Sequence, residues 1–532
     1  MRFMRNVPSE NPAPVPFLGF TGVLVRATLT RMNLAQAFAD SARKRPDKTA
    51  LYWGESEFTY ASLLARSEAV TRQLTQSFGV KPGDRVAIWL KNCPEFVPAL
   101  FGILGAGAVV VPINNFLKPQ EVSYILADAD ANLLISDVEL SAHFPALTAE
   151  RPELKFLKVE EFQPADGDRQ SAIGNRQSTE SDLAVLIYTS GTTGRPKGAM
   201  LSHGNLLHNV ESCRIVLETV DQDRMAVLLP MFHSYMLTVG ILLPLIVGGS
   251  LVLARSLHQP RQILQEFCER RATILPAIPQ FYRTLASAPA AMPLPFRICI
   301  SGAAPLPAQV LKDFEEKFKI PLIEGYGLSE ASPVVSKNPL RGVRKVGSIG
   351  LPIPNVEVSV QDESGRILGP KEIGEICVRG GNVMQGYWKN PQATAEVMRG
   401  GWLLTGDIGY RDEDGYFYIT DRKKDMLLVN GINVYPREIE EVLYQFPGVK
   451  EVAVIGVPDV RKGEQPVAYV AFNDGVTADE RTLQQFLKPR LADYKIPRHI
   501  ITMPALPRNA TGKILKTALR ELSAKSGQDQ GQ

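Results

Sequence analysis

The sequence predicts an α/β protein: a large N-terminal part of stacked α/β subdomains with a small β subdomain, followed by a small α+β domain. Three observations lead to this prediction. Apolar strand-like runs alternate with amphipathic helical segments as far as Gly347, which is typical of helices covering largely parallel sheets. From Gly347 the pattern changes to short alternating strands with Gly and Pro turns. Beyond Arg422, helical and strand patterns return over a stretch long enough for a compact domain of its own.

The composition is that of an ordinary globular protein, since 45% of the 532 residues are hydrophobic and 22% are charged. The 59 basic and 56 acidic residues leave a net charge of +3, which gives no support to a nucleic acid as a partner. The five cysteines are scattered singly, without the C-x-x-C spacing of a metal or redox site. We therefore expect reduced thiols in a cytoplasmic protein.

Two segments invite comparison with export or membrane signals. Residues 1–31 carry arginines around a Pro-rich stretch but no continuous apolar region, so we expect no secretory signal; they form a loose arm, or Met32 is the true start. Residues 225–254 contain no Asp, Glu, Lys or Arg, but Pro230, Pro244 and two adjacent glycines interrupt them. A buried strand, loop, helix and strand accounts for this stretch better than a transmembrane segment does.

The expected elements follow from the period of the apolar residues. Residues 34–78 are helical apart from a strand pair near 50–58. The strands expected next, separated by helices such as 94–105, lie at 85–90, 108–113, 133–136, 183–188, 225–229, 251–253, 272–275, 298–300 and 322–324. Ligands bind beyond the carboxyl ends of such strands, so we expect a pocket where segments 231–235, 301–305 and 325–330 follow them.

The later elements are shorter. The β subdomain should contain strands at 356–360 and 374–379. A helix is expected at 436–446, because Pro436 suits its first turn and Gly448 follows its end. Strands at 452–457 and 467–472, a helix at 483–492 and a last amphipathic helix from about 514 complete the chain, whose tail from Ser526 is polar and expected to fray.

The stretch with the most specific chemistry begins where the predicted strand at 183–188 ends. It reads Thr189-Ser190-Gly191-Thr192-Thr193-Gly194-Arg195-Pro196-Lys197. Its glycines let successive backbone N–H groups point at one centre, and the hydroxyls and lysine add donors, which suits a polyphosphate. A solvated polar turn is the alternative. The turn is not a Walker loop, because Pro196 stands at the second glycine of that motif and Gly198 at its Mg²⁺-binding hydroxyl.

The phrase YTSGTTGRPKG resembles the signature of the adenylate-forming superfamily, which includes acyl-CoA synthetases, luciferases and the adenylation domains of peptide synthetases. The likeness covers about residues 34–522, and through LPMFHSY, SGAAPLP and GYGLSE it is nearest to bacterial medium- and long-chain fatty acid CoA ligases. It implies an AMP-binding N-terminal domain at 32–421, a mobile C-terminal AMP-binding domain at 422–525 and a tail at 526–532.

The resemblance also implies a nucleotide site. Tyr326 would lie against adenine, with Gly302 and Ala303 opposite, while Asp407 and Arg422 would hold the ribose. The full set of implied ATP- and AMP-binding residues is Thr189, Ser190, Gly191, Thr192, Thr193, Gly194, Lys197, Gly302, Ala303, Ala304, Glu324, Gly325, Tyr326, Gly327, Ser329, Asp407, Arg422 and Lys513. Position 329 is usually threonine in the superfamily, and the serine here keeps the hydroxyl. Taken alone, Gly-Tyr-Gly also fits a turn with a core aromatic residue. Asp407, which follows a glycine, also fits an ordinary turn residue.

The residues that the resemblance makes catalytic are Lys513, Glu330 and His233. Lys513 would bridge the attacking carboxylate and the α-phosphate, although most C-terminal lysines are simply solvated. Glu330, with Thr189, would bind Mg²⁺, for which a carboxylate is a suitable hard ligand. A surface or capping glutamate is the alternative for Glu330. Lys424 falls at the superfamily hinge, about which the C-terminal domain would turn between half-reactions.

The acid slot is the least defined part of the site. His233 stands where amino-acid-activating relatives place an aspartate, which disfavours an α-amino acid. Residues 236–243 are apolar and fit either a tunnel for a hydrocarbon chain or a buried core helix.

The resemblance implies activation of a carboxylic acid, a medium- or long-chain fatty acid, through acyl-AMP to acyl-CoA, with ATP and CoA as co-substrates and Mg²⁺ as cofactor. Three alternatives are an acyl-AMP ligase loading a carrier protein, a CoA ligase for an aryl or other small acid, and a nucleotide-binding module without catalysis. The uninterrupted sequence at 421–426 favours CoA over a carrier protein, because carrier-loading relatives often have an insertion there. A homodimer and a peripheral membrane contact stay open.

Overall fold

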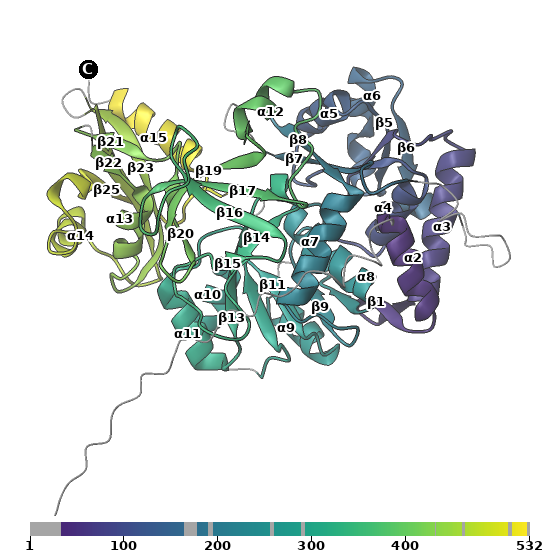
Figure 1. Cartoon of the computed structure of the whole chain (residues 1–532), viewed down its shortest axis with the longest axis horizontal. Coiled ribbons are helices and arrows are strands. Elements are labelled where there is room, and N and C mark those ends of the chain that lie inside the picture. The colour runs from purple at the N-terminus through teal and green to yellow at the C-terminus, as the bar shows by residue number, and fades with distance from the viewer. Residues whose placement is uncertain are drawn as a thin grey trace, which may run out of the picture.

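The computed structural model describes residues 33–163, 178–189, 195–255, 260–288, 293–430, 432–459, 463–508 and 513–528. Within these residues the strands form four sheets, and helices cover the two largest (Figure 1). The predicted α/β class is confirmed. The predicted N-terminal arm lies outside the described residues, and so does the tail beyond residue 528.

The first sheet has the strand order β6-β5-β3-β4-β7-β8 and is parallel except for its last pair. Its strands are β3 (Arg85–Ile88), β4 (Val109–Pro112), β5 (Ala131–Ser136), β6 (Lys155–Lys158), β7 (Leu183–Thr189) and β8 (Lys197–Ser202). Residues 184–187 of β7 are buried, as expected for a parallel strand that is covered on both faces. The sheet therefore holds the end of β7 in a fixed position.

The second sheet has nine strands in the order β15-β14-β13-β12-β11-β9-β10-β1-β2. They are β1 (Thr49–Trp53), β2 (Ser56–Thr59), β9 (Arg224–Val227), β10 (Ser250–Leu253), β11 (Ile274–Ala277), β12 (Ile298–Ser301), β13 (Leu322–Gly327), β14 (Val334–Lys337) and β15 (Leu351–Pro352). The expected end of β13 at residue 324 is wrong. The strand continues through Gly327, because β14 pairs with it antiparallel and places Lys337 opposite Gly325.

The helices of the large body lie around and between these two sheets (Figure 1). They are α2 (Leu34–Lys44), α3 (Tyr60–Gln76), α4 (Phe96–Gly105), α5 (Pro119–Asp128), α6 (Phe144–Glu150), α7 (His203–Val216), α8 (Leu243–Val247), α9 (Pro260–Glu269), α10 (Pro279–Ser287), α11 (Ala308–Phe318) and α12 (Pro391–Val397). Helix α7 begins at a capping box, in which Ser202 accepts from Asn205 N and the Asn205 side chain accepts from Ser202 N. This helix packs beside the site described below.

The uncharged stretch at 225–254 forms β9, a π-helix at Met236–Leu242, α8 and β10. All seven residues of the π-helix are buried. The predicted buried strand, loop, helix and strand is thus confirmed. Among the residues that the structure describes, no helix combines the length and the apolar character needed to cross a membrane.

The small β subdomain is a five-stranded sheet whose pairs are all antiparallel. Its strands are β16 (Val356–Gln361), β17 (Gly374–Gly380), β18 (Met398–Arg399), β19 (Trp402–Arg411) and β20 (Phe417–Arg422). The turn between β19 and β20 contains Gly415 at φ +86°, a conformation that favours glycine. In this hairpin Asp407 lies directly opposite Arg422.

The remaining elements form a body with its own apolar core, at the left of Figure 1. They are β21 (Leu427–Val429), β22 (Ile432–Val434), α13 (Pro436–Leu443), β23 (Val449–Asp459), β24 (Gly463–Phe472), α14 (Glu480–Leu487), β25 (His499–Thr502) and α15 (Lys516–Gln528). The predicted ends of α13 and α14 are wrong, since the helices stop earlier. Helix α14 also begins earlier than predicted, because Asp479 caps it by accepting from Thr482 N.

Candidate active site

A pocket of about 690 Å³ lies where the large body, the small β subdomain and the C-terminal body meet. Its lining comes from the end of β7, the segment after β9, the end of β12, β13 with the turn that follows it, β20 and Lys513. The described residues that line it include six cations, namely Lys197, Lys337, Arg422, Lys423, Lys424 and Lys513, and three carboxylates, namely Glu330, Glu375 and Glu396. An excess of cations in a concave site suits an anionic ligand such as a polyphosphate.

One wall of the pocket is the end of β7 and the start of β8. Thr189 pairs with Lys197 across this hairpin, and both residues line the pocket. The amine of Lys197 lies 5.5 Å from the centroid of the Tyr387 ring. The predictions for Ser190, Gly191, Thr192, Thr193 and Gly194 lie outside the described residues.

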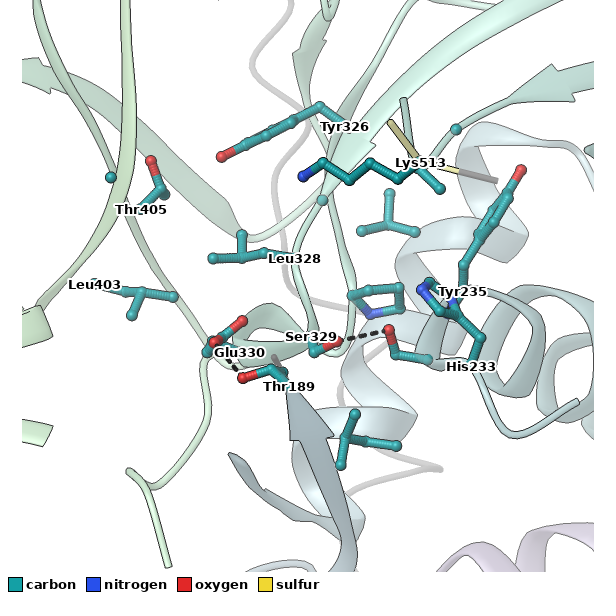
Figure 2. Close-up of a pocket in the computed structure, with 18 of the residues that line it drawn as sticks. Thr189, His233, Tyr235, Tyr326, Leu328, Ser329, Glu330, Leu403, Thr405 and Lys513 are labelled. Carbon is teal, nitrogen blue, oxygen red and sulfur yellow. Dashed lines mark hydrogen bonds between the residues drawn. The ribbon is translucent and has the colours of Figure 1, made fainter. Parts of the chain in front are cut away.

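Glu330 lies in a short 3₁₀ turn, Ser329–Ala331, soon after β13. Its Oε1 accepts a hydrogen bond of 2.8 Å from the Tyr387 hydroxyl and one of 3.5 Å from Thr189 Oγ1. The carboxylate therefore lies beside the Thr189 hydroxyl in the pocket (Figure 2), and it is neither a surface glutamate nor a helix cap. Sequence reasoning missed Tyr387, because an aromatic residue in GYWKN is indistinguishable from an ordinary core residue.

Tyr326 forms a second wall, and the loop after β12 lies in the same lining. A Cβ on Gly302 would lie 3.2 Å from the Tyr235 ring, which is closer than an ordinary contact, so the glycine lets the backbone approach that ring. Ala303 has φ +66°, in the left-handed region. Ala304 is not among the residues that line the pocket.

Glu324 also does not line this pocket. Its Oε1 accepts a hydrogen bond of 3.0 Å from Leu306 N, which ties β13 to the segment after β12. Burial raises the pKa of the Glu324 carboxyl to about 7, against the opposing effect of Arg437. The hydrogen bond between Leu306 and Glu324 thus holds the loop after β12 against β13, outside the pocket lining.

Asp407 is 3% exposed and lies behind the lining, whereas Thr405, Gly406 and Arg422 line the pocket. Its Oδ2 accepts a hydrogen bond of 2.5 Å from the Tyr326 hydroxyl, and its Oδ1 lies 3.0 Å from Arg422 Nε. The spacing between Asp407 and Arg422 that the sequence shows is therefore the register of the β19–β20 hairpin. Tyr326, Asp407 and Arg422 form one hydrogen-bonded group.

Lys513 comes from the far end of the chain and lines the same pocket as Thr189. Figure 2 shows its side chain extending into the pocket beside Tyr326, with Glu330 and Thr189 across from it in this view. Desolvation, and next the neighbouring Arg422, lower the pKa of Lys513 to about 8, while Asp407 opposes the shift. Lys424 lines the pocket as well, and desolvation lowers its pKa.

His233 lies on the side of the pocket away from Thr405 (Figure 2). Desolvation lowers its pKa to about 4, so the imidazole is neutral at physiological pH. Its Nδ1 accepts a hydrogen bond of 3.2 Å from Tyr235 N, which assigns the proton of the neutral ring to Nε2. His233 thus offers one N–H donor. The neighbouring Ser234 and Ser329 hydroxyls lie 3.0 Å apart.

Part of the lining is apolar and comes from α7 and its end, the π-helix, β12 and β14, namely Cys213, Leu217, Val239, Ile300 and Val334. We call this part of the pocket the acid slot. Val239 is the one residue of the segment 236–243 in the described lining, and the rest of that segment packs in the core. The segment is therefore mostly a buried core helix, and only Val239 contributes to a slot that could hold a hydrocarbon chain.

Comparisons with known proteins agree on one family. The description "AMP-binding enzyme" matches residues 38–388, and "AMP-binding enzyme C-terminal domain" matches residues 438–513. A long-chain-fatty-acid–CoA ligase of Bacillus subtilis (strain 168) is 37% identical over 536 residues, covering 93% of this chain and 95% of its own. A feruloyl-CoA synthase of an Amycolatopsis species is 38% identical over 484 residues, with 90% and 96% covered.

A solved structure gives the same result. The o-succinylbenzoate coenzyme A synthetase of Bacillus subtilis, in complex with ATP and magnesium ion, superposes with a TM-score of 0.81 at 30% sequence identity. The match covers 92% of this chain and all of that one.

Proposed function

Because the chain belongs to the AMP-binding enzyme family and is an AMP-forming acid–CoA ligase, we propose that its acid is a medium- or long-chain fatty acid. The observation that carries the site assignment is that Thr189 and Lys513, more than three hundred residues apart in the sequence, line one pocket. The chain length of the acid is supported by the Bacillus subtilis relative and by the largely apolar acid slot.

In the first half-reaction a carboxylate oxygen of the acid attacks the α-phosphorus of ATP. The new O–P bond gives acyl-AMP, and the bond to the β-phosphate breaks to release pyrophosphate. We assign the phosphates to the turn from Thr189 to Lys197, with Ser190, Gly191, Thr192, Thr193 and Gly194 supplying further donors. Lys513 would hold the attacking carboxylate and the α-phosphate together, where a fixed cation stabilises the developing charge.

The residues present fit Mg²⁺, because Glu330 and Thr189 supply a carboxylate and a hydroxyl 3.5 Å apart. Mg²⁺ typically takes one or two protein oxygens and fills its other positions with water and phosphate oxygens. When bound, the ion would neutralise charge on the phosphates. Tyr387, whose hydroxyl donates to the Glu330 carboxylate, would fix the orientation of this ligand.

We propose the other roles from the resemblance, and the pocket lining supports those of Tyr326 and Arg422. Tyr326 would lie against adenine, with Gly302, Ala303 and the flanking Gly325 and Gly327 giving the base room. Asp407 and Arg422 would hold the ribose. The Nε2–H of His233 would donate to the carboxylate of the acid and orient it toward the phosphorus.

In the second half-reaction the thiolate of CoA attacks the acyl carbon, the C–S bond forms, and AMP leaves. We propose that the C-terminal body, residues 422–525, turns about Lys424 between the two steps. The backbone there supports this position, since Lys424 lies between β20 and β21, which belong to different sheets. The cytoplasm is the proposed location, a choice supported by the five free cysteines.

The test is acid-dependent ATP–pyrophosphate exchange with a panel from acetate to oleate that includes benzoate and ferulate. We expect the highest kcat/KM with medium- or long-chain acids, together with AMP release that requires CoA. A maximum at ferulate would assign an aryl acid instead, a substrate class that the Amycolatopsis relative makes a real alternative. The proposal would be contradicted if AMP release required a carrier protein. It would also be contradicted if exchange proceeded without any added acid.

The pH dependence of the first half-reaction should report Lys513. Its ammonium form is present below its pKa of about 8 and is lost as the pH rises through that value, so kcat/KM for exchange should fall on the alkaline side. Lys513→Arg keeps a cation to higher pH and should move the fall upward, even if the rate is lower. A fall at the same pH in Lys513→Arg would assign it to another group.

A further inference from the structure

Lys337, the last residue of β14, is a charged residue of the pocket lining, and Cys213 of the acid slot is among its electrostatic neighbours. It is 5% exposed. The register places it directly opposite Gly325, on the same face of the sheet, and a Cβ on Gly325 would lie 3.6 Å from the Lys337 Cβ. The missing side chain of Gly325 thus leaves the slot open next to the lysine.

The amine of Lys337 has one described hydrogen bond, a donation of 2.7 Å to Val216 O at the end of α7. An ammonium group has three N–H donors, so this bond uses one of them. Within the described residues Lys337 has no ion pair. Its charged neighbours are committed elsewhere, since Arg297 pairs with Asp223 at 2.7 Å and Glu218 with Arg341 at 2.8 Å.

The remaining neighbours give the amine no counter-charge. Cys213, on α7, also lines the slot, but burial raises the pKa of its thiol to about 12 and keeps it neutral. Burial lowers the pKa of Lys337 to about 7, with Cys213 and Glu218 raising it and Arg297 lowering it further. A buried cation without a carboxylate is costly, and a hydrocarbon chain packed against it would add to that cost.

The bond to Val216 O caps the end of α7, but capping a helix does not by itself require a lysine in the pocket lining. Lys317 performs the same task for α10, donating to the carbonyls of Leu285, Ala286 and Ala288, and it lies outside the pocket lining. Lys337 differs because it lines the pocket that the acid must enter, whereas Lys317 does not. Two of its three N–H donors have no described partner and are available to a ligand oxygen.

We propose that Lys337 is a specificity-determining residue that selects acids carrying a second carboxylate at the end remote from the reacting carboxyl group. This inference rests on the proposed acid activation and narrows its substrate class from plain alkanoates to fatty acids with an oxidised far end. The second carboxylate would supply the counter-charge that the described protein residues do not. Such a substrate would come from a reaction class that oxidises the terminal methyl group of a fatty acid.

The experiment compares suberate with octanoate, which have the same number of carbons, in ATP–pyrophosphate exchange. Wild type should prefer suberate by about tenfold in kcat/KM, and Lys337→Met should lose that preference, as expected for removal of a hydrogen bond to a charged group. Lys317→Met is the matched control, because it removes a helix-capping lysine outside the pocket and should leave the preference unchanged. A folded Lys337→Met protein with the wild-type ratio would overturn the inference.

A second measurement needs no variant. The ratio of kcat/KM for suberate to that for octanoate should fall as the pH rises through about 7, the pKa of Lys337 in the free enzyme. The alkaline fall due to Lys513 affects both acids and cancels in the ratio. A flat ratio, or a wild-type preference for octanoate, contradicts the role of Lys337 while leaving acid activation intact. If neither suberate, octanoate nor any other acid of the panel supports exchange, the proposed function itself is contradicted.

Discussion

Lys513→Ala is expected to lower kcat/KM for acid-dependent ATP–pyrophosphate exchange by about 10²–10³-fold, the loss typical of removing one donor to a developing oxyanion. The reason is positional, because Lys513 lines the pocket that Thr189 and Glu330 also line. Beyond Lys424, Lys513 is the one residue that the chain contributes to the described lining. Binding of ATP alone should change less than the rate.

Lys516→Met is the matched control for Lys513→Ala. Lys516 follows shortly after in the chain and pairs with Glu440 at 2.8 Å, but it does not line the pocket. Lys516→Met should keep exchange near the wild-type rate, and the comparison requires that both variants keep the melting temperature of wild type. Exchange at the wild-type rate in a folded Lys513→Ala protein would contradict the proposed mechanism at its centre.

Glu330→Gln is expected to lower kcat/KM about 100-fold and to raise the Mg²⁺ concentration that gives half the maximal rate, since metal sites lose about 10–100-fold in affinity even when only an orienting partner is removed. The substitution keeps the shape of the side chain and its contact with Tyr387, and removes the charge. Exchange measured over a Mg²⁺ titration checks both effects.

Glu396→Gln makes the same chemical change on another part of the lining. Glu396 is exposed and has one described hydrogen bond, from Gln392 on the same helix, so we expect wild-type Mg²⁺ dependence. Equal Mg²⁺ dependence in Glu330→Gln and wild type would remove Glu330 as a ligand. A large shift in both variants would indicate a general effect of pocket charge.

The sequence predicted the parts of this protein whose physical cause is local. The buried strand at 183–188, the largely parallel sheets and the strands of the small β subdomain follow from apolar period and turn residues, and the structure has them. The helix ends at α13 and α14 were harder, because capping depends on single side chains such as Asp479.

The features that the sequence could not give arise from contacts between distant segments. Tyr387 reaches Glu330, Tyr326 reaches Asp407, and Lys337 borders the acid slot only because β13 and β14 pair. The residues next to each of them in the sequence do not indicate these distant partners. The positions of Lys513 and Arg422 in the site were predictable only through the resemblance to a known superfamily.

The central claim is that the turn after β7 and Lys513 act on one nucleotide, and a double-mutant cycle in exchange tests it most directly. Thr189→Val removes the hydroxyl and keeps the shape, so the four proteins are wild type, Thr189→Val, Lys513→Ala and the double variant. Groups that act on the same phosphate should be coupled, and the loss in the double variant should be clearly smaller than the product of the two single losses. Losses that multiply fully would show that the two residues act independently and would contradict the account.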